Sequence, residues 1–170
     1  MDDAASRAPE TIEAARLGAL RALHALDSGS DSRFDRIART AALLLRAPRA
    51  GIILIDENRL WHKARIGIPA GEFPRAGSLT DLMTQNPGTV FSSDITIDPR
   101  FEAARNRPNQ RDVRFYAAAP LNAPGGEVLG VLSVGDPEPH EAHTDAEQLA
   151  LEDLAALASE MLVHDAENID

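Results

Sequence analysis

The sequence predicts an α+β fold: a central antiparallel sheet of five or six strands, with terminal helices on one face and loops and short helices covering the other. The strongest indication is a hairpin from Arg114 to Gly135, in which two apolar runs are separated by Asn122, Pro124 and Gly125–Gly126. These residues supply the fixed and positive φ angles that a tight reversal needs. Local turns also join the other predicted strands, which favours antiparallel pairing over a doubly wound sheet.

Two amphipathic helices are predicted before the first strand. From Glu10 to Leu26, apolar residues recur at helical spacing until a turn at Asp27–Ser30. A second helix is predicted to start at Ser32, whose hydroxyl can cap the first turn, and to end before Pro48.

Two strands follow the helices. The first is a buried strand at Gly51–Ile55, and after a turn the second runs over Arg59–Gly67. Residues of the second strand alternate, so one face is predicted to be basic and to carry the only tryptophan. The two faces are Leu60, His62, Ala64 and Ile66 on one side, and Arg59, Trp61, Lys63 and Arg65 on the other.

Residues 69–114 have no sustained periodicity, and we expect them to cover one face of the sheet. They include a short helix after Ser78, a short strand at Thr89–Ser92 and one helical turn at Phe101–Ala104. A connection of this length within a compact domain is usually functional or mobile. After the hairpin, Thr144-Asp145-Ala146-Glu147 forms a capping box that begins a final helix ending near Val163.

Composition limits the classes of function. The 170 residues are expected to form one domain over residues 11–165, with flexible ends at 1–10 and 166–170. The chain has no cysteine, which excludes disulfides, thiolate metal sites, cysteine nucleophiles and thioether-linked chromophores. Its formal charge is −10, and residues 115–170 contain twelve Asp or Glu and no Lys or Arg. This argues against nucleic-acid binding, which needs a basic face.

The sequence also indicates the cellular location of the protein and contains one cluster of arginines. The sequence has no signal-peptide pattern and no apolar run of about 18 residues, so we expect a cytoplasmic protein without a membrane partner. Five arginines cluster between positions 100 and 114, and two interpretations stay open: a solvated loop that partly neutralises the acidic end, or an anion-binding site. They are Arg100, Arg105, Arg107, Arg111 and Arg114.

No constellation predicts catalysis or metal binding. His140 and His143 lie three residues apart, but neighbouring prolines place them in a loop and no third ligand is specified. Phosphate-loop, dinucleotide and nucleophile-elbow motifs are absent, so we expect no enzyme activity, no metal and no cofactor. A small-molecule pocket under the loops remains as a hypothesis. Alanines beside Tyr116 leave room either for a ligand or for close helix packing.

Six segments between Glu13 and Val163 form a pattern when they are taken in order. They are Glu13–Leu17 continuing to Leu26–Asp27, Phe34–Arg39, Ile55–Trp61, Asp98–Phe101, Arg114–Leu121 and Gly130–Val134. Together they resemble the GAF domain family, specifically its bacterial sensor type. The resemblance implies a central antiparallel sheet with a small-molecule pocket under loops on one face, in agreement with the element order above.

The resemblance also implies site residues. In relatives with known pockets, the positions matching Tyr116 and Ser133 point into the site, and strand alternation adds Gly135. The predicted ligand-binding set is Tyr116, Ser133, Trp61, Phe91, Asp94, Phe101 and Gly135. Where many relatives have a Phe-Cys pair followed by His, this chain has Leu79 and Thr80. The cysteine chemistry of the free-methionine sulfoxide reductases in this superfamily is therefore excluded.

Two functional hypotheses follow. The first is a non-catalytic domain that binds an unknown small molecule and signals through its terminal helices, which would pair in a homodimer. Its output is expected to pass to a separate signalling protein. The alternative is a structural dimerisation or interaction module with a vestigial pocket. An enzyme related to the free-methionine sulfoxide reductases is a third hypothesis, for which the sequence provides no reactive group.

Overall fold

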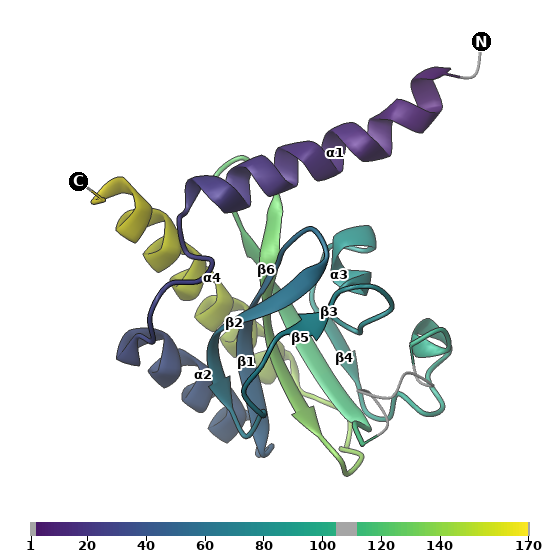
Figure 1. Cartoon of the computed structure of the whole chain (residues 1–170). Coiled ribbons are helices and arrows are strands. Elements are labelled where there is room, and N and C mark those ends of the chain that lie inside the picture. Colours follow the sequence, from purple (N-terminus) through teal and green to yellow (C-terminus); the bar gives the residue numbers. More distant parts are fainter. Residues whose placement is uncertain (1–2, 105–111, 170) are drawn as a thin grey trace.

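The computed structural model describes residues 3–104 and 112–169, with side chains described from residue 10 onward. In this part of the chain, six strands form one antiparallel sheet in the order β3-β2-β1-β6-β5-β4 (Figure 1). The predicted α+β class is confirmed. The described helices include none that is both long and apolar enough to cross a membrane. The bounds are α1 Asp3–Ala22, α2 Ser32–Leu44, β1 Arg49–Ile55, β2 Arg59–Ile66, β3 Phe73–Pro74, α3 Leu82–Gln85, β4 Val90–Ser92, the 3-10 helix η1 Pro99–Phe101, β5 Phe115–Asn122, β6 Val128–Asp136 and α4 Asp145–Glu167.

The sheet separates two hydrophobic clusters. Helices α2 and α4 cover one face, called here the helix face, while the segments from β3 to η1 cover the other, called the loop face (Figure 1). Strand β5 shows how the chain serves both: Ala117 and Ala119 belong to the helix-face cluster, whereas Tyr116 and Ala118 belong to the loop-face cluster. Alternation along the predicted hairpin therefore assigns its side chains to the correct faces.

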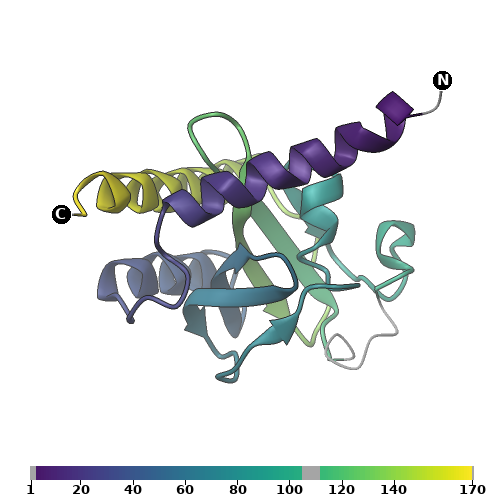
Figure 2. The same ribbon diagram turned by 45° about the horizontal axis from the view of Figure 1, so that its top comes forward.

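Helix α1 crosses one end of the sheet, as both views show (Figures 1 and 2). It begins at Asp3, N-terminal of its predicted start. Arg16, only 4% exposed, donates hydrogen bonds to the carbonyl oxygens of Ile55 at 2.6 Å and Val128 at 3.3 Å. Glu13 accepts two further bonds from the same guanidinium, at 2.8 and 2.9 Å. Because the buried charge is paired and hydrogen-bonded, it attaches the helix firmly to the sheet.

Of the two helix caps predicted from the sequence, the structure confirms one. Asp31 caps α2, since its carboxylate accepts a hydrogen bond from the backbone N–H of Arg33 at 2.9 Å. The predicted cap at Ser32 is wrong because Ser32 is already the first helical residue. The capping box of α4 is confirmed. The Thr144 hydroxyl accepts from the N–H of Glu147 at 3.1 Å, and the Glu147 carboxylate accepts from the N–H of Thr144 at 3.0 Å.

A bulge interrupts the pairing of β1 with β2. Ile53 lies opposite His62, whereas the neighbouring Ile52 lies opposite Ala64. Lys63 is therefore an extra residue on β2, and such an insertion shifts the alternation of the strand beyond it.

The bulge makes the predicted alternation of β2 wrong over its second half. Leu60 belongs to the loop-face cluster, and His62 lines the same face. Ala64 and Ile66 instead pack with Trp61 in the helix-face cluster. The sequence pattern did not reveal the extra residue because the strand stays amphipathic on both sides of it.

Strand β6 packs against β1 with unusually close backbone contact. A Cβ atom added at Gly130 would lie 2.0 Å from the carbonyl oxygen of Ile53. Any side chain at this position would push apart the two central strands. At Gly135 on the same strand, an added Cβ would meet no atom closer than 3.8 Å.

We predict that Gly130→Ala lowers the free energy of unfolding by more than about 2 kcal/mol, because the added methyl group overlaps backbone that cannot move independently. Chemical denaturation followed by circular dichroism measures the change. Gly135→Ala is the matched control and should lie within about 0.5 kcal/mol of the wild type. Equal stabilities of the two variants would contradict the close contact.

Candidate ligand-binding site

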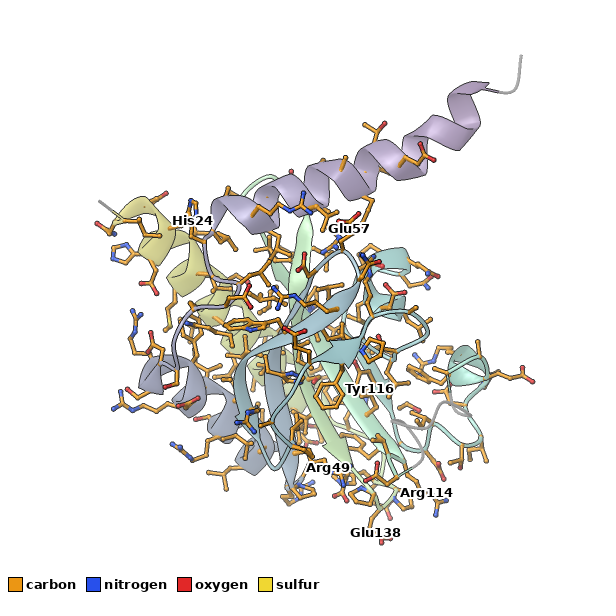
Figure 3. All side chains as sticks on the ribbon, viewed as in Figure 1. His24, Arg49, Glu57, Arg114, Tyr116 and Glu138 are labelled. Carbon is orange, nitrogen blue, oxygen red and sulfur yellow. The ribbon has the colours of Figure 1, made fainter. Side chains whose placement is uncertain are left out.

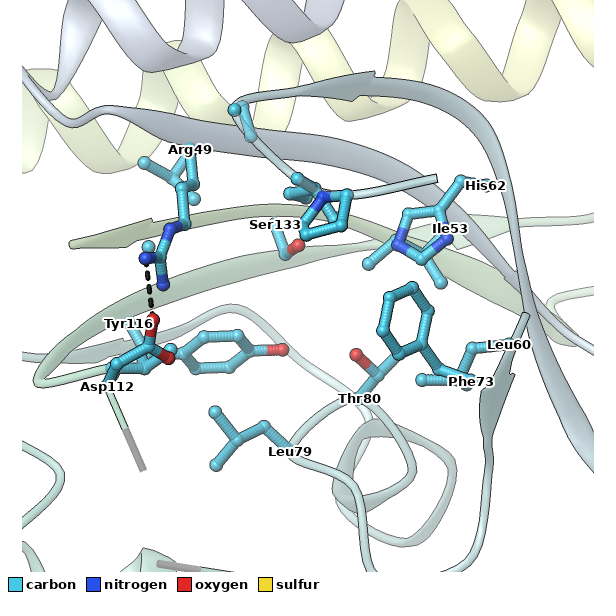
Figure 4. A pocket seen from close by; sticks show the side chains of 17 residues that line it. Arg49, Ile53, Leu60, His62, Phe73, Leu79, Thr80, Asp112, Tyr116 and Ser133 are labelled. Carbon is cyan, nitrogen blue, oxygen red and sulfur yellow. Dashed lines mark hydrogen bonds and ion pairs between the residues drawn. The ribbon is translucent and has the colours of Figure 1, made fainter. Parts of the chain in front are cut away.

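A cavity of about 410 Å³ lies on the loop face, between the sheet and the segments that cover it (Figure 4). Strands β1, β2, β5 and β6 contribute its floor. Residues 67–69, Phe73 and the Leu79–Thr80 segment contribute its cover, and Asp112–Val113 lies at one side. The volume is within the usual range for small-ligand sites.

Strand register brings three predicted site residues to this cavity. Gly135 of β6 lies opposite both Tyr116 of β5 and Arg49 of β1, so the three positions form a row across the sheet. Ser133 lies two residues earlier on β6 and lines the same cavity. Tyr116, Ser133 and Gly135 are thus brought together, and their binding of a ligand stays a prediction.

The Tyr116 hydroxyl is the most unusual group in the cavity. Its side chain is 5% exposed, it points into the cavity (Figure 4), and its oxygen has no hydrogen-bond partner among the described residues. Burial raises the pKa of Tyr116 to about 12. The Thr80 hydroxyl is near enough to oppose this shift, but the pair lacks the geometry of a hydrogen bond. A buried hydroxyl without a partner is costly, so a polar ligand group that reached it after a shift of the cover would be stabilised.

His62 contributes a second unpaired polar atom. Its Nδ1 is buried without a hydrogen-bond partner in the described structure, and its ring meets that of Phe73 edge to face at 5.3 Å. Burial, assisted by the positive charge of Arg65, lowers the pKa of His62 to about 4. The imidazole is therefore neutral near pH 7, and its Nδ1 can either donate or accept a hydrogen bond, according to the tautomer.

Charged groups occur at the edge of the cavity. Arg49 Nη2 lies 2.7 Å from the carboxylate of Asp112, as the dashed line in Figure 4 marks. The hydrogen bond from Arg49 also lowers the pKa of Asp112. The pair is partly exposed to solvent, so its energy is modest.

The alanines of β5 do not line the cavity. Ala117 and Ala119 are fully buried under the helices, and Ala118 is fully buried in the loop-face cluster. Close packing therefore accounts for these three residues. The open volume lies beside them, along the row of Arg49, Gly135 and Tyr116.

Three predicted aromatic residues lie outside this cavity. Trp61 packs against the helix-face cluster, on the opposite side of the sheet. Phe91 also packs there, with its ring stacked on His143 at 3.9 Å. Phe101 is buried beside Tyr116, with the two rings edge to face at 5.9 Å, and lines a separate hollow next to α3. Phe101 thus supports the tyrosine without facing the cavity.

The predicted residue Asp94 has a structural partner. Its carboxylate accepts hydrogen bonds from Arg114 and from the Thr96 hydroxyl and N–H. These bonds, led by that from Arg114, lower the pKa of Asp94 to about 2. Arg114 and Glu138 lie at the lower end of the molecule in Figure 3, away from Tyr116. Within the described structure, Arg114, which immediately precedes β5, therefore binds the carboxylate of Asp94.

The arginine cluster is only partly described. Arg100 donates to the carboxylate of Asp98 and, at 2.8 Å, to the carbonyl oxygen of Phe91. With Arg114 paired as above, both described members bind groups of the protein itself. The remaining members, Arg105, Arg107 and Arg111, lie outside the described residues.

The two loop histidines, His140 and His143, each contact a polar side chain and stack on a phenylalanine. His140 lies 2.7 Å from the Asp136 carboxylate and stacks on Phe115 at 3.8 Å. His143 stacks on Phe91 and contacts the Gln148 side chain at 3.0 Å. Over residues 3–104 and 112–169, no group of three or more potential ligands is arranged to hold a metal ion.

Several residues that line the cavity are not among those predicted from the sequence, including Arg49, His62, Phe73 and Thr80. The alternation of β2 places His62 inward beside Leu60, so its position was available from the pattern. The other three depend on strand register and loop course. Neither is encoded in local periodicity.

Comparison with known families identifies the fold. The family model described as GAF domain matches residues 30–162. The chain belongs to the GAF domain family. A cyclic di-GMP phosphodiesterase of Pseudomonas aeruginosa is 33% identical to this chain over 132 residues, which are 78% of this chain and 22% of that protein. The chain thus spans about a fifth of the length of this curated relative.

Solved structures share the GAF fold at low sequence identity. The GAF domain of an Acinetobacter phosphoenolpyruvate-protein phosphotransferase has a TM-score of 0.65 at 21% identity, covering 91% of this chain and 98% of that one. The free methionine-R-sulfoxide reductase of Neisseria meningitidis has a TM-score of 0.64 at 17% identity, covering 87% of each chain. The PixJ GAF domain of Thermosynechococcus elongatus has a TM-score of 0.61 at 19% identity, covering 79% and 86%.

Tyr116 is the only tyrosine, so its ionisation can be followed directly. Because burial disfavours the phenolate, we predict that absorbance near 295 nm titrates at about pH 12, well above the ordinary value of 10. Circular dichroism at each pH should confirm that the protein is still folded. A folded-state midpoint near 10 would contradict the buried position of the hydroxyl.

Proposed function

We propose that this chain is a non-catalytic sensory GAF domain that binds a small molecule in the loop-face cavity and transmits binding to its terminal helices. The observation that carries the proposal is the buried, unpartnered Tyr116 hydroxyl pointing into a cavity of about 410 Å³. The similarity to a segment of a cyclic di-GMP phosphodiesterase supports a role in signal transduction.

A physical connection joins the cavity cover to α1. Arg75 follows β3 and donates hydrogen bonds to Asp81 at 2.7 Å and to Glu13 of α1 at 2.5 Å. The segment between Arg75 and Asp81 contains Leu79 and Thr80, which line the cavity. A ligand that moves this segment would therefore pull on α1 through Arg75. Signalling in this way requires that the ligand bind two arrangements of the cover with different affinity.

The proposed output surface is formed by the terminal helices. Ile12 on α1 is 68% exposed, and Leu149 and Leu157 on α4 are 59% and 51% exposed. Apolar side chains exposed on helices of this kind are suited to pairing with a second copy. These residues support a homodimer, which can relay the signal to a separate protein. They equally support the alternative of a structural dimerisation module whose cavity has lost its ligand.

The proposed role is recognition of a ligand and uses no thiol chemistry. With no cysteine in the chain, the thiol chemistry of free-methionine sulfoxide reduction has no nucleophile. Among the described lining residues, Tyr116 and His62 have buried polar atoms without partners, and their shifted pKa values keep both neutral near pH 7. Neutral groups of this kind suit recognition of a ligand.

A thermal-shift screen against a broad metabolite panel tests the proposal. A true ligand at about 100 times its Kd should raise Tm by roughly 5–10 °C, because it binds only the folded state. Gly135→Leu should abolish this shift, because its side chain enters the cavity from a position with free space. Gly135→Ala is the matched control and should retain most of it.

The screen also separates the two candidate functions. A dimer in light scattering that no compound stabilises would favour the structural dimerisation module. A shift that persists unchanged in Gly135→Leu would place the ligand elsewhere and contradict the proposed site.

The link between α1 and the cover predicts a pH-dependent stability. Hydrogen bonds from Arg16 and Arg75 lower the pKa of Glu13 from 4.5 to about 2. A depressed carboxyl pKa stabilises the folded state above pH 4.5, and this contribution is lost as pH falls toward 2. Glu13→Gln should therefore reduce the free energy of unfolding by about 1 kcal/mol at pH 7, after allowance for partial exposure.

Urea denaturation of wild type and Glu13→Gln at pH 7 and pH 3 measures this effect. The difference between the two proteins should shrink at pH 3. Glu10→Gln, at an exposed position on the same helix, is the control and should change little at either pH. A gap that is equally large at both pH values would show that the effect is not due to the Glu13 charge.

A further inference from the structure

We propose that the cavity takes an uncharged small molecule with an apolar ring body and an oxygen or nitrogen atom that accepts a hydrogen bond from the Tyr116 hydroxyl. This inference rests on the proposed function, since it specifies the ligand class of the same site. Three features of the described lining support it: its balanced charge, its unpaired polar atoms and its apolar walls.

The described lining offers no unpaired charge. Arg49 and Asp112 are its only formally charged residues, and they bind one another at 2.7 Å. The pair adds no net charge to the described lining, so neither an anion nor a cation finds an uncompensated counter-ion among these residues. Burying an uncompensated charge is far more costly than burying a neutral ligand.

The unpaired polar atoms specify hydrogen bonding by neutral groups. Tyr116 is protonated near pH 7 and its hydroxyl lacks a partner, so a ligand acceptor would satisfy a donor that is otherwise buried without one. His62 Nδ1 offers a second site, which can donate or accept according to its tautomer. Amides, esters, lactones and neutral heterocycles carry suitable groups.

The walls specify an apolar, flat body. Ile53, Leu60 and Leu79 are at most 5% exposed and line the cavity together with the Phe73 ring. Figure 4 shows Phe73, Leu79 and Tyr116 surrounding the same space. Aliphatic and aromatic side chains in this arrangement favour contact with a ring.

Three probes with the same ring test the charge preference: benzamide is neutral, benzoate is an anion and benzylamine is a cation at pH 7. Titrations followed by ¹H–¹⁵N NMR of the full chain report contact at the Tyr116 and Ser133 amides. We expect benzamide to shift these amides with at least tenfold higher affinity than either charged probe. Equal or tighter binding of benzoate or benzylamine would overturn the inference.

Two variants test the assigned contacts. Tyr116→Phe removes only the unpaired hydroxyl, so it should fold with an unchanged or higher Tm and bind benzamide roughly fivefold more weakly. Arg36→Gln, at an exposed position on α2 outside the cavity lining, is the control and should leave benzamide affinity within about twofold. Unchanged affinity in Tyr116→Phe, or loss of binding in Arg36→Gln, would contradict the inference.

The outcomes distinguish this inference from the proposed function. If a charged probe is preferred and Gly135→Leu blocks its binding, the cavity is a ligand site of another class and only the inference fails. If none of the three probes shifts the cavity amides up to its solubility limit, the inference fails. If the metabolite screen is also negative, the proposed function fails with it.

Discussion

The close pairing of β1 with β6 is the constraint on which the rest of the structure depends. Gly130 permits this contact, because a Cβ atom there would overlap the carbonyl oxygen of Ile53. The resulting register sets Arg49 opposite Gly135, and the β5–β6 pairing sets Gly135 opposite Tyr116. Both the floor of the cavity and the carbonyl groups that receive α1 therefore follow from how these central strands meet.

Local sequence patterns predicted the elements that depend on local physics. The hairpin, the alternation of Tyr116 against its neighbours and the Thr144 capping box follow from turn residues, strand period and helix capping, all of which act over a few residues. The bulge at Lys63 depends instead on how two strands fit, and local alternation carries no sign of it. Trp61 entered the expected site only through the family resemblance, whereas strand alternation places it opposite Leu60 and His62, and the structure confirms that it packs on the helix face.

The chain distributes its buried charge unevenly. At the end of the sheet, Arg16 and Arg75 meet Glu13, Asp81 and backbone carbonyls, so each buried charge there is compensated. Among the described residues of the cavity, by contrast, the Tyr116 hydroxyl and the His62 ring are buried and neutral, and both have an atom without a partner. The first arrangement stabilises a fixed contact between α1 and the sheet. The second leaves hydrogen-bonding capacity unused, which is the property expected of a recognition site.

The central claim is that a small molecule forms hydrogen bonds with the Tyr116 hydroxyl and His62 Nδ1, which lack partners in the described part of the cavity. Native mass spectrometry of the gently purified full chain tests it most directly, because bound mass and oligomeric state are measured together. We expect a stoichiometric small molecule on the wild-type protein that is released on unfolding and is missing from Gly135→Leu. A bound molecule of identical mass on both proteins, or ligand-free wild type after incubation with an extract of the host cells, would contradict the account.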